Sequence, residues 1–166
     1  VFAGSYAPVN TFSFGGSLQW KGIDFSIMFQ GVSGNYIYNG LKQLAMNGRN
    51  DYGNLIEDVM NTWDFNPESS RYPRLGIVKD NNGNYNNFSD IFLEKGDYLR
   101  LKNLTIGYTV PKFCKHVPGL RVYASMDNLL TFTRYSGVDP EVGNYGVDRG
   151  VYPVAKFVNF GINMKF

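Results

Sequence analysis

Apolar and polar residues alternate along two long stretches near the start of the chain. In 10–20 and again in 23–33, apolar side chains occupy nearly every second position. This alternation is typical of a β-strand with one apolar and one polar face. The two residues between the stretches, Lys21 and Gly22, suit a tight turn, because glycine accepts a positive φ. The pattern predicts an antiparallel hairpin of two long strands.

A second long hairpin is predicted from residues 98–110 and 120–133, joined by a short turn flanked by prolines. In the first of these strands the apolar positions change parity, from Leu99 and Leu101 to Leu104 and beyond. A slip of one residue near Lys102–Asn103 is what a β-bulge produces. The strands are longer than the five or six residues, roughly, of an ordinary soluble strand.

A fifth strand is predicted at 156–166. Its apolar row ends on an aromatic residue and consists of Val158, Phe160, Ile162, Met164 and Phe166. Its length matches the roughly nine to eleven residues with which a tilted strand crosses a membrane.

The connections between the five strands alternate between short and long. The long ones are 34–97 and 134–155. Within the first, apolar spacing over 55–63 after Asn54, a candidate N-cap, predicts a short amphipathic helix. Residues 75–88 in the same connection predict a small hairpin. A loop of this length with its own elements is usually functional.

Short turns on one side and long loops on the other are typical of transmembrane β-barrels. Aromatic residues at the strand margins fit the interfacial girdles of such barrels, and these are Trp20, Tyr108, Phe132 and Phe166. The predicted fold is all-β: a portion of a transmembrane antiparallel β-barrel with long extracellular loops. Five strands cannot enclose a water-filled lumen, which takes about eight, so further strands are expected. A passive porin or adhesin barrel and a secreted carbohydrate-binding β-sandwich are the alternatives.

Composition and motifs exclude several functions. A net charge of +2 is too small to indicate nucleic-acid binding. The single cysteine, Cys114, permits no internal disulfide, and His116 near it has no orienting acid or metal-ligand spacing. The stretch 80–84 lacks the spacing of an EF-hand and predicts a turn. We therefore expect no enzyme, no cofactor and no metal. A chain that starts at Val1 without methionine or signal peptide is expected to be a piece of a longer protein.

The long loops carry aromatic and polar residues suited to sugars or peptides. Six loop residues are the candidate contacts to a solute or to a lid protein: Trp63, Asp139, Glu141, Tyr145, Asp148 and Arg149. For three of them a structural role is an equal or better explanation. Trp63 would pack the short helix against the barrel rim. Asp148 and Arg149 would form a solvated pair.

Several motifs in one order carry a family resemblance. Residues 98–111 read Tyr-Leu-Arg-Leu-Lys-Asn-Leu-Thr-Ile-Gly-Tyr-Thr-Val-Pro, and residues 120–129 contain Leu-Arg-Val-Tyr and Asp-Asn-Leu. An Asp-Pro-Glu triplet ends at Glu141, and a looser match spans 63–73. With the aromatic C-terminus, this sequence resembles the C-terminal region of SusC/RagA-type TonB-dependent outer-membrane transporters.

The resemblance implies the last five strands of a 22-stranded barrel with an N-terminal plug, the plug and the TonB-contacting segment lying outside these residues. It implies TonB-energised import of an oligosaccharide or peptide across the outer membrane of a Gram-negative, Bacteroidetes-like cell, with a SusD-like surface lipoprotein as lid. The terminal strand, with Phe160, Ile162, Met164 and Phe166, would be the signal read by the assembly machinery.

Overall fold

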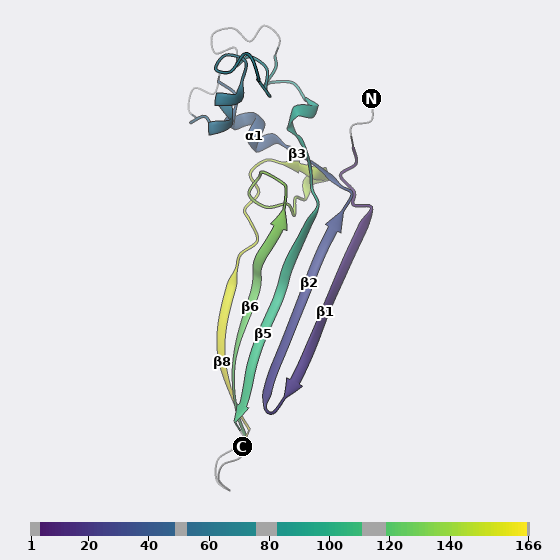
Figure 1. Ribbon diagram of the computed structural model, residues 1–166, viewed down its shortest axis with the longest axis vertical. Coiled ribbons are helices and arrows are strands. Elements are labelled where there is room, and N and C mark those ends of the chain that lie inside the picture. Colours follow the sequence, from purple (N-terminus) through teal and green to yellow (C-terminus); the bar gives the residue numbers. More distant parts are fainter. Residues whose placement is uncertain (1–3, 49–52, 76–82, 111–118, 166) are drawn as a thin grey trace. The chain divides into compact units, whose positions relative to one another are not determined.

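The computed structural model describes residues 4–48, 53–75, 83–110 and 119–165, which fall into two compact units (Figure 1). We call them the sheet unit and the loop unit and describe each by itself. The sheet unit consists of Pro8–Ser33, Asp97–Arg134 and Pro153–Phe166. The loop unit consists of Val1–Ala7, Gly34–Gly96 and Tyr135–Tyr152.

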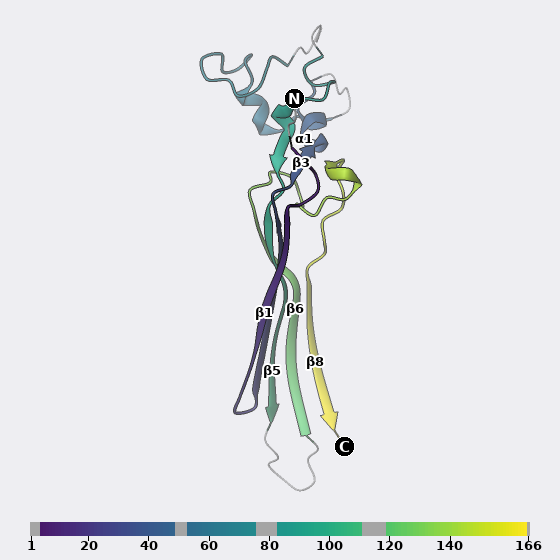
Figure 2. The same ribbon diagram turned by 90° about the vertical axis from the view of Figure 1, so that its right-hand side faces the viewer.

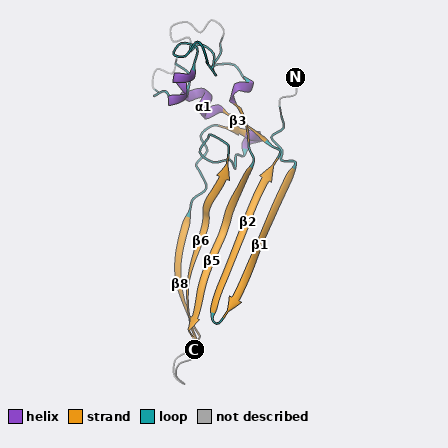
Figure 3. Cartoon of the chain, in the orientation of Figure 1, coloured by secondary structure: helices purple, strands orange, loops and turns teal. Residues whose placement is uncertain are grey.

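The sheet unit is one antiparallel sheet in the order β1-β2-β5-β6-β8 (Figure 3). Figure 2 shows these strands from the side, where the sheet is twisted. The strands are β1 (Asn10–Trp20), β2 (Ile23–Ser33), β5 (Tyr98–Val110), β6 (Gly119–Thr133) and β8 (Phe157–Lys165). The first three have the bounds that the alternation predicts. β6 begins one residue before the predicted 120–133, and β8 begins one residue after the start of the predicted 156–166 and ends at Lys165. Phe166 lies outside the described residues.

The register brings the apolar positions of all five strands onto one face. Phe14 of β1 pairs with Phe29 of β2, which pairs with Leu101 of β5. The rings of Phe14 and Phe29 stack with their centroids 5.1 Å apart. Further along the strands, Val122 of β6 pairs with Ile162 of β8. Because side chains alternate with period two, the opposite positions form a second face that is mostly polar.

A β-bulge keeps this register, as predicted. Leu101 and Asn103 pair with neighbours on both sides while Lys102 is passed over in both ladders. On β6 the matching irregularity includes Asn128, whose φ of 53° is in the left-handed region. Without the extra residue, every apolar side chain after Leu104 would turn to the polar face.

The predicted turn between β1 and β2 is also confirmed. Lys21 has φ 48° and Gly22 has φ 87°, which is the left-handed pair that a tight two-residue hairpin requires. The right-handed twist of the strands favours this turn over those with negative φ.

The loop unit contains short elements around a small three-stranded sheet in the order β4-β3-β7. Its strands are β3 (Tyr36–Asn39), β4 (Leu93–Lys95) and β7 (Val147–Asp148), and its helices are α1 (Gly40–Ala45) and the 3₁₀ turns η1 (Glu57–Asn61), η2 (Asp90–Phe92) and η3 (Asn144–Gly146). In the described part of the chain, no helix is long and apolar enough to cross a membrane.

The loop unit has its own hydrophobic core. The buried residues that pack together are Met46, Val59, Tyr72, Leu75, Tyr85 and Phe92. The Tyr85 hydroxyl donates a hydrogen bond of 2.8 Å to the carbonyl of Pro73, so the polar end of this buried ring is satisfied. The excursion between β2 and β5 is therefore folded around a core of its own.

Two predictions within this unit are wrong. The expected helix over 55–63 is a 3₁₀ turn that begins after Ile56, so Asn54 is not its N-cap. Only Val59 of its apolar residues is buried, and the chain becomes extended at Thr62, which bridges to Tyr72. Tertiary pairing thus ends the helical pattern after one turn.

The second arm of the hairpin expected at 75–88 is also absent. In 83–88 the chain turns, with the N–H groups of Asn86 and Asn87 donating to the carbonyl of Gly83. Residues 76–82 lie outside the described part of the chain.

Candidate functional site

The loop unit carries a polar network around the start of α1. The Asn39 side chain is the N-cap, because its oxygen accepts the backbone N–H of Lys42 at 2.9 Å. The same buried side chain donates to Oε1 of Glu94 and to Oγ of Ser136, at 3.2 Å each. One asparagine thereby joins β3, β4 and the segment that follows β6.

Glu94 is the acceptor at the centre of this network. Its Oε2 accepts the backbone N–H of Ser136 at 2.8 Å, and its Oε1 accepts the Ser136 hydroxyl at 2.7 Å. The ammonium of Lys42 lies 3.9 Å from Oε1. A carboxylate with this many donors is held in one position and is preorganised.

Lys42 forms its short ion pair with Asp58, at 2.6 Å between Nζ and Oδ2. Burial lowers the pKa of Lys42, but its hydrogen bonds to Asp58 and Tyr72 outweigh that effect and raise the pKa. The hydrogen bond from Lys42 holds the pKa of Asp58 below its usual value, against the smaller opposing effect of burial. The Lys42 side chain is 11% exposed and that of Asp58 is 40% exposed, so the carboxylate is the accessible partner.

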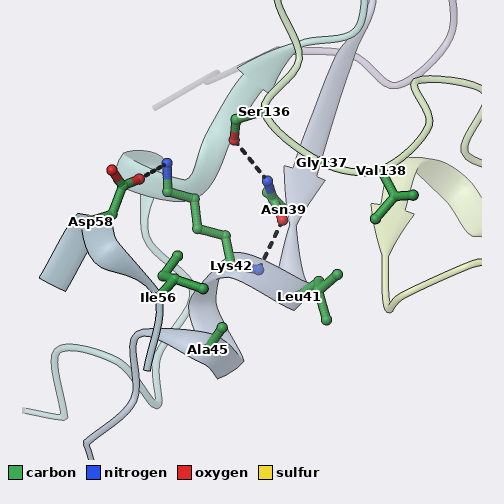
Figure 4. Close-up of a pocket in the computed structure, with 9 residues that line it drawn as sticks. All are labelled: Asn39, Leu41, Lys42, Ala45, Ile56, Asp58, Ser136, Gly137 and Val138. Carbon is green, nitrogen blue, oxygen red and sulfur yellow. Dashed lines mark hydrogen bonds and ion pairs between the residues drawn. The ribbon is translucent and has the colours of Figure 1, made fainter. Parts of the chain in front are cut away.

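Asn39, Lys42, Asp58 and Ser136 of this network border a pocket of about 350 Å³ (Figure 4). The figure shows the Lys42 side chain extending to Asp58 and Asn39 reaching to Ser136. The lining is Asn39, Leu41, Lys42, Ala45, Ile56, Asp58, Ser136, Gly137 and Val138. The volume is at the lower end of the range of small-molecule sites, which is roughly 300–1,000 Å³. An apolar rim beside one accessible carboxylate suits a ligand with hydrogen-bond donors next to an apolar group.

Among the six loop candidates predicted from the sequence, Asp148 has a structural role. It is 3% exposed, and its Oδ2 accepts the Tyr135 hydroxyl at 2.6 Å. Its Oδ1 accepts the N–H of Gly150 at 2.8 Å. Burial, together with this hydrogen bond and the nearby carboxylates, raises the pKa of Tyr135, so the phenol remains a donor. Asp148 holds the loop in place and does not face solvent.

Tyr145 and Arg149 are both exposed. Tyr145 is 82% exposed, and its φ of 57° is in the left-handed region that non-glycine residues seldom adopt. Its ring meets that of Tyr6 edge-on at 5.8 Å. Arg149 borders a second groove of the loop unit. The solvated pair expected between Asp148 and Arg149 is not formed, because Asp148 is buried against Tyr135.

Trp63 is 45% exposed, and the guanidinium of Arg74 lies 4.1 Å from its ring centroid. Arg74 is itself held by Asp64, at 3.2 Å between Nε and Oδ1. One face of the indole is therefore occupied. In the second connection, Oδ1 of Asp139 accepts the N–H of Glu141 at 2.9 Å, a local turn that explains their close spacing.

None of the six candidates borders the pocket in Figure 4. The polar network beside this pocket consists of Asn39, Lys42, Asp58, Glu94 and Ser136, and sequence reasoning missed all five. For α1 a signal existed, because an asparagine precedes Leu41, Leu44 and Ala45 at helical spacing. No comparable local signal marks Glu94 or Ser136, which meet only through the tertiary fold.

The sheet unit has a different chemistry on each of its faces. On the apolar face, Trp20 and Tyr108 are exposed at the same strand ends, both paired with Ile23, and Phe132 is exposed near the opposite ends. On the polar face, the Asn103 amide donates to Asp127 at 2.7 Å. A five-stranded sheet with a bare apolar face, aromatic margins and a hydrogen-bonded polar face is a portion of the wall of a transmembrane β-barrel.

No family model matches the chain. Individual relatives do match nearly all of it. The TonB-dependent receptor P3 of Formosa agariphila is 32% identical over 98% of this chain and 17% of its own length. The TonB-dependent receptor SusC of Bacteroides thetaiotaomicron is 28% identical over 90% of this chain and 14% of its own.

Solved structures agree. The RagAB peptide importer in its closed-closed state superimposes with a TM-score of 0.81 at 30% identity, covering 98% of this chain and 18% of that one. A structure of the RagAB peptide transporter gives 0.81 at 31% identity over the same shares. The chain belongs to the SusC/RagA family of TonB-dependent receptors, as part of its β-barrel. It spans under a fifth of the length of these relatives. The named relatives are receptors and importers, in line with a non-enzymatic role.

Proposed function

We propose that this chain forms wall strands and extracellular loops of an outer-membrane transporter that imports oligosaccharides or peptides. The observation that carries the proposal is the register of the sheet unit. Apolar residues pair across five strands on one face, while the other face carries the ion pair of Arg121 and Asp24 and hydrogen bonds such as that of Asn103 to Asp127. Lipid on one side and water on the other is the environment that satisfies both faces.

The names of the relatives support the energy source and the partner that we propose. Their names support a TonB-coupled cycle, and a plug from the rest of the parent protein would make that coupling. A SusD-like surface lipoprotein would cover the outer mouth, as one half of a two-component importer of the RagAB kind. The folded loop unit, with its own core and pockets, supplies a surface for solute or lid. The protein would lie in the outer membrane of a Gram-negative cell.

Uptake by cells that carry the parent protein as their sole importer of a labelled solute tests this function. Peptides and oligosaccharides would be supplied separately, with and without TonB. We expect uptake of one class to depend on TonB and on the lipoprotein encoded with the receptor. Uptake that continues unchanged without TonB would show a passive porin and overturn the proposal. A heat-modifiable band in both strains is the control for barrel insertion.

A further inference from the structure

The second groove of the loop unit has the chemistry of a binding site for one kind of solute. It has a volume of about 440 Å³ and lies between α1, the turn at 83–88 and β7. Its lining consists of Tyr38, Gly40, Leu41, Gln43, Leu44, Asn47, Tyr85, Asn86, Phe88, Val147 and Arg149. We call it the Arg149 groove.

Two of its apolar side chains are open to solvent. Phe88 is 80% exposed, with its ring centroid 4.8 Å from that of Tyr38, and Leu44 is 54% exposed. Leu41 and Val147 extend the same apolar surface. Exposed apolar groups that line a concave surface favour an apolar ligand group, because its burial removes both surfaces from water.

Arg149 is the single charged residue of this lining. It is exposed, and among the described residues it has neither an ion pair nor a hydrogen bond. An unpaired guanidinium presents a planar fork of donors that matches a carboxylate. The groove therefore offers a place for one negative charge beside an apolar group.

The side-chain amides of the groove distinguish a sugar from a peptide as its ligand. Gln43 is fully engaged, because its Nε2 donates to the carbonyls of Tyr85 and Asn87 and its Oε1 accepts the Tyr38 hydroxyl. Burial raises the pKa of Tyr38, so that hydroxyl remains protonated. A sugar would bury several hydroxyls against groups that are already satisfied or apolar, and buried polar groups without partners are costly.

Asn86 leaves its side-chain NH2 group for a peptide. Its Oδ1 accepts the amide of Asn47 at 2.9 Å, whereas its own amide nitrogen has no partner among the described residues. Both N–H donors of this NH2 group are therefore free to meet a peptide carbonyl. Taking the apolar surface, Arg149 and Asn86 together, we propose that the Arg149 groove binds the C-terminal residue of a peptide, with an apolar side chain on Phe88 and Leu44 and its carboxylate on Arg149. This inference rests on the proposed import function and names its solute class.

Binding of defined peptides to the purified full-length receptor in detergent tests the groove directly. The reference probe is a fluorescent glycine–serine pentapeptide that ends in leucine with a free carboxylate. The comparison probes are the same peptide as its C-terminal amide, a version that ends in serine, and a neutral oligosaccharide of similar mass. The variants are Arg149→Gln and Phe88→Ala. Lys95→Gln removes an exposed cation elsewhere in the loop unit and is the matched control.

We expect Arg149→Gln to weaken binding of the leucine peptide about tenfold, the effect of losing one charge-assisted hydrogen bond. Amidation should weaken binding to the unmodified receptor by a similar factor and should add nothing to the variant. Phe88→Ala should reduce the preference for leucine over serine. Lys95→Gln should have no effect.

Equal affinity of Arg149→Gln and unmodified receptor for the free-acid peptide would overturn the groove assignment. So would equal losses with the acid and the amide, or tighter binding of the oligosaccharide that Phe88→Ala removes. These outcomes leave TonB-dependent uptake untouched, whereas TonB-independent uptake overturns the proposed function without changing the peptide affinities. The two failures are therefore distinguishable.

Discussion

The guanidinium of Arg121 on β6 is paired with the carboxylate of Asp24 on β2 across the intervening strand β5. Nε lies 2.9 Å from Oδ1, and Nη2 makes a second contact with Oδ2. The residue of β5 beneath them is Gly107. The strand between the two charges has no side chain at the point where they meet, so the pair can form over it. The guanidinium also lies 4.9 Å from the ring centroid of Tyr123.

Replacing Gly107 by valine should break this bridge. A Cβ at position 107 would lie 2.5 Å from Oδ2 of Asp24 and 2.7 Å from Nη2 of Arg121. Both side chains would have to leave their positions. We expect less folded, heat-modifiable protein in outer-membrane fractions. Gly119→Val is the control, since a Cβ there meets nothing within 4 Å. Equal folded fractions in the two variants would show that the bridge does not matter for assembly.

Charge on the apolar face should cost more than charge on the polar face. Ile162 is 64% exposed on the apolar face of β8, and Asn163 is its neighbour on the opposite face. Ile162→Arg places a cation in lipid at a cost of about 2–4 kcal/mol, whereas Asn163→Arg places it in water. Surface levels of the two variants, measured by whole-cell labelling, should differ severalfold. Equal levels would contradict the assigned faces.

Removing the Tyr135 hydroxyl should loosen the segment 135–152. Tyr135→Phe removes the hydroxyl that donates to Oδ2 of Asp148 at 2.6 Å, while the carboxylate remains buried. An unsatisfied buried acceptor costs about 1–3 kcal/mol. We expect faster proteolysis and hydrogen exchange in this segment, with unchanged barrel insertion. Tyr152→Phe is the control because Tyr152 is 87% exposed. Identical protection from proteolysis and hydrogen exchange in both variants would show that other contacts stabilise this segment.

The ion pair of Lys42 and Asp58 should make the loop unit sensitive to extremes of pH. The pKa of Asp58 is lowered from 3.8. Its contribution to the stability of the loop unit is therefore present above pH 3.8 and is lost as the pH falls through the lowered pKa. The pKa of Lys42 is raised from 10.5. Its contribution to the stability of the loop unit is therefore present below pH 10.5 and is lost as the pH rises through the raised pKa. Hydrogen exchange in α1 should be protected between these limits.

Asp58→Asn should abolish the acid limb of this profile and lower protection at neutral pH. A variant with the same acid limb as the unmodified protein would show that another group is responsible.

The sequence predicted the sheet closely because lipid and water impose a pattern with period two on every strand. Bounds, hairpin turn and bulge could all be predicted, the last from the change of parity between Leu101 and Leu104. No such boundary between lipid and water imposes a pattern on the loop unit. Its apolar residues pack on one another, so the helical spacing around Val59 gives one 3₁₀ turn where the prediction was a helix.

The candidate site was harder still to predict. Asn39, Glu94 and Ser136 lie far apart in the sequence and meet through hydrogen bonds that leave no local pattern. Conversely, Asp148 looks like a surface carboxylate in sequence but is buried under Tyr135. The second long connection is part of the loop unit's fold, because β7 pairs with β3.

The central claim is that the two faces of this sheet meet lipid and water, and spin-label accessibility along β8 tests it most directly. Labels would be placed singly at Val158, Asn159, Phe160, Ile162 and Asn163 of the full-length protein in outer-membrane vesicles, with Cys114 replaced by serine. We predict collision with oxygen, which concentrates in lipid, to be highest at Val158, Phe160 and Ile162. Collision with a water-soluble nickel chelate should be highest at Asn159 and Asn163. Accessibility to both reagents that does not alternate, or that alternates in the opposite phase, would contradict the account.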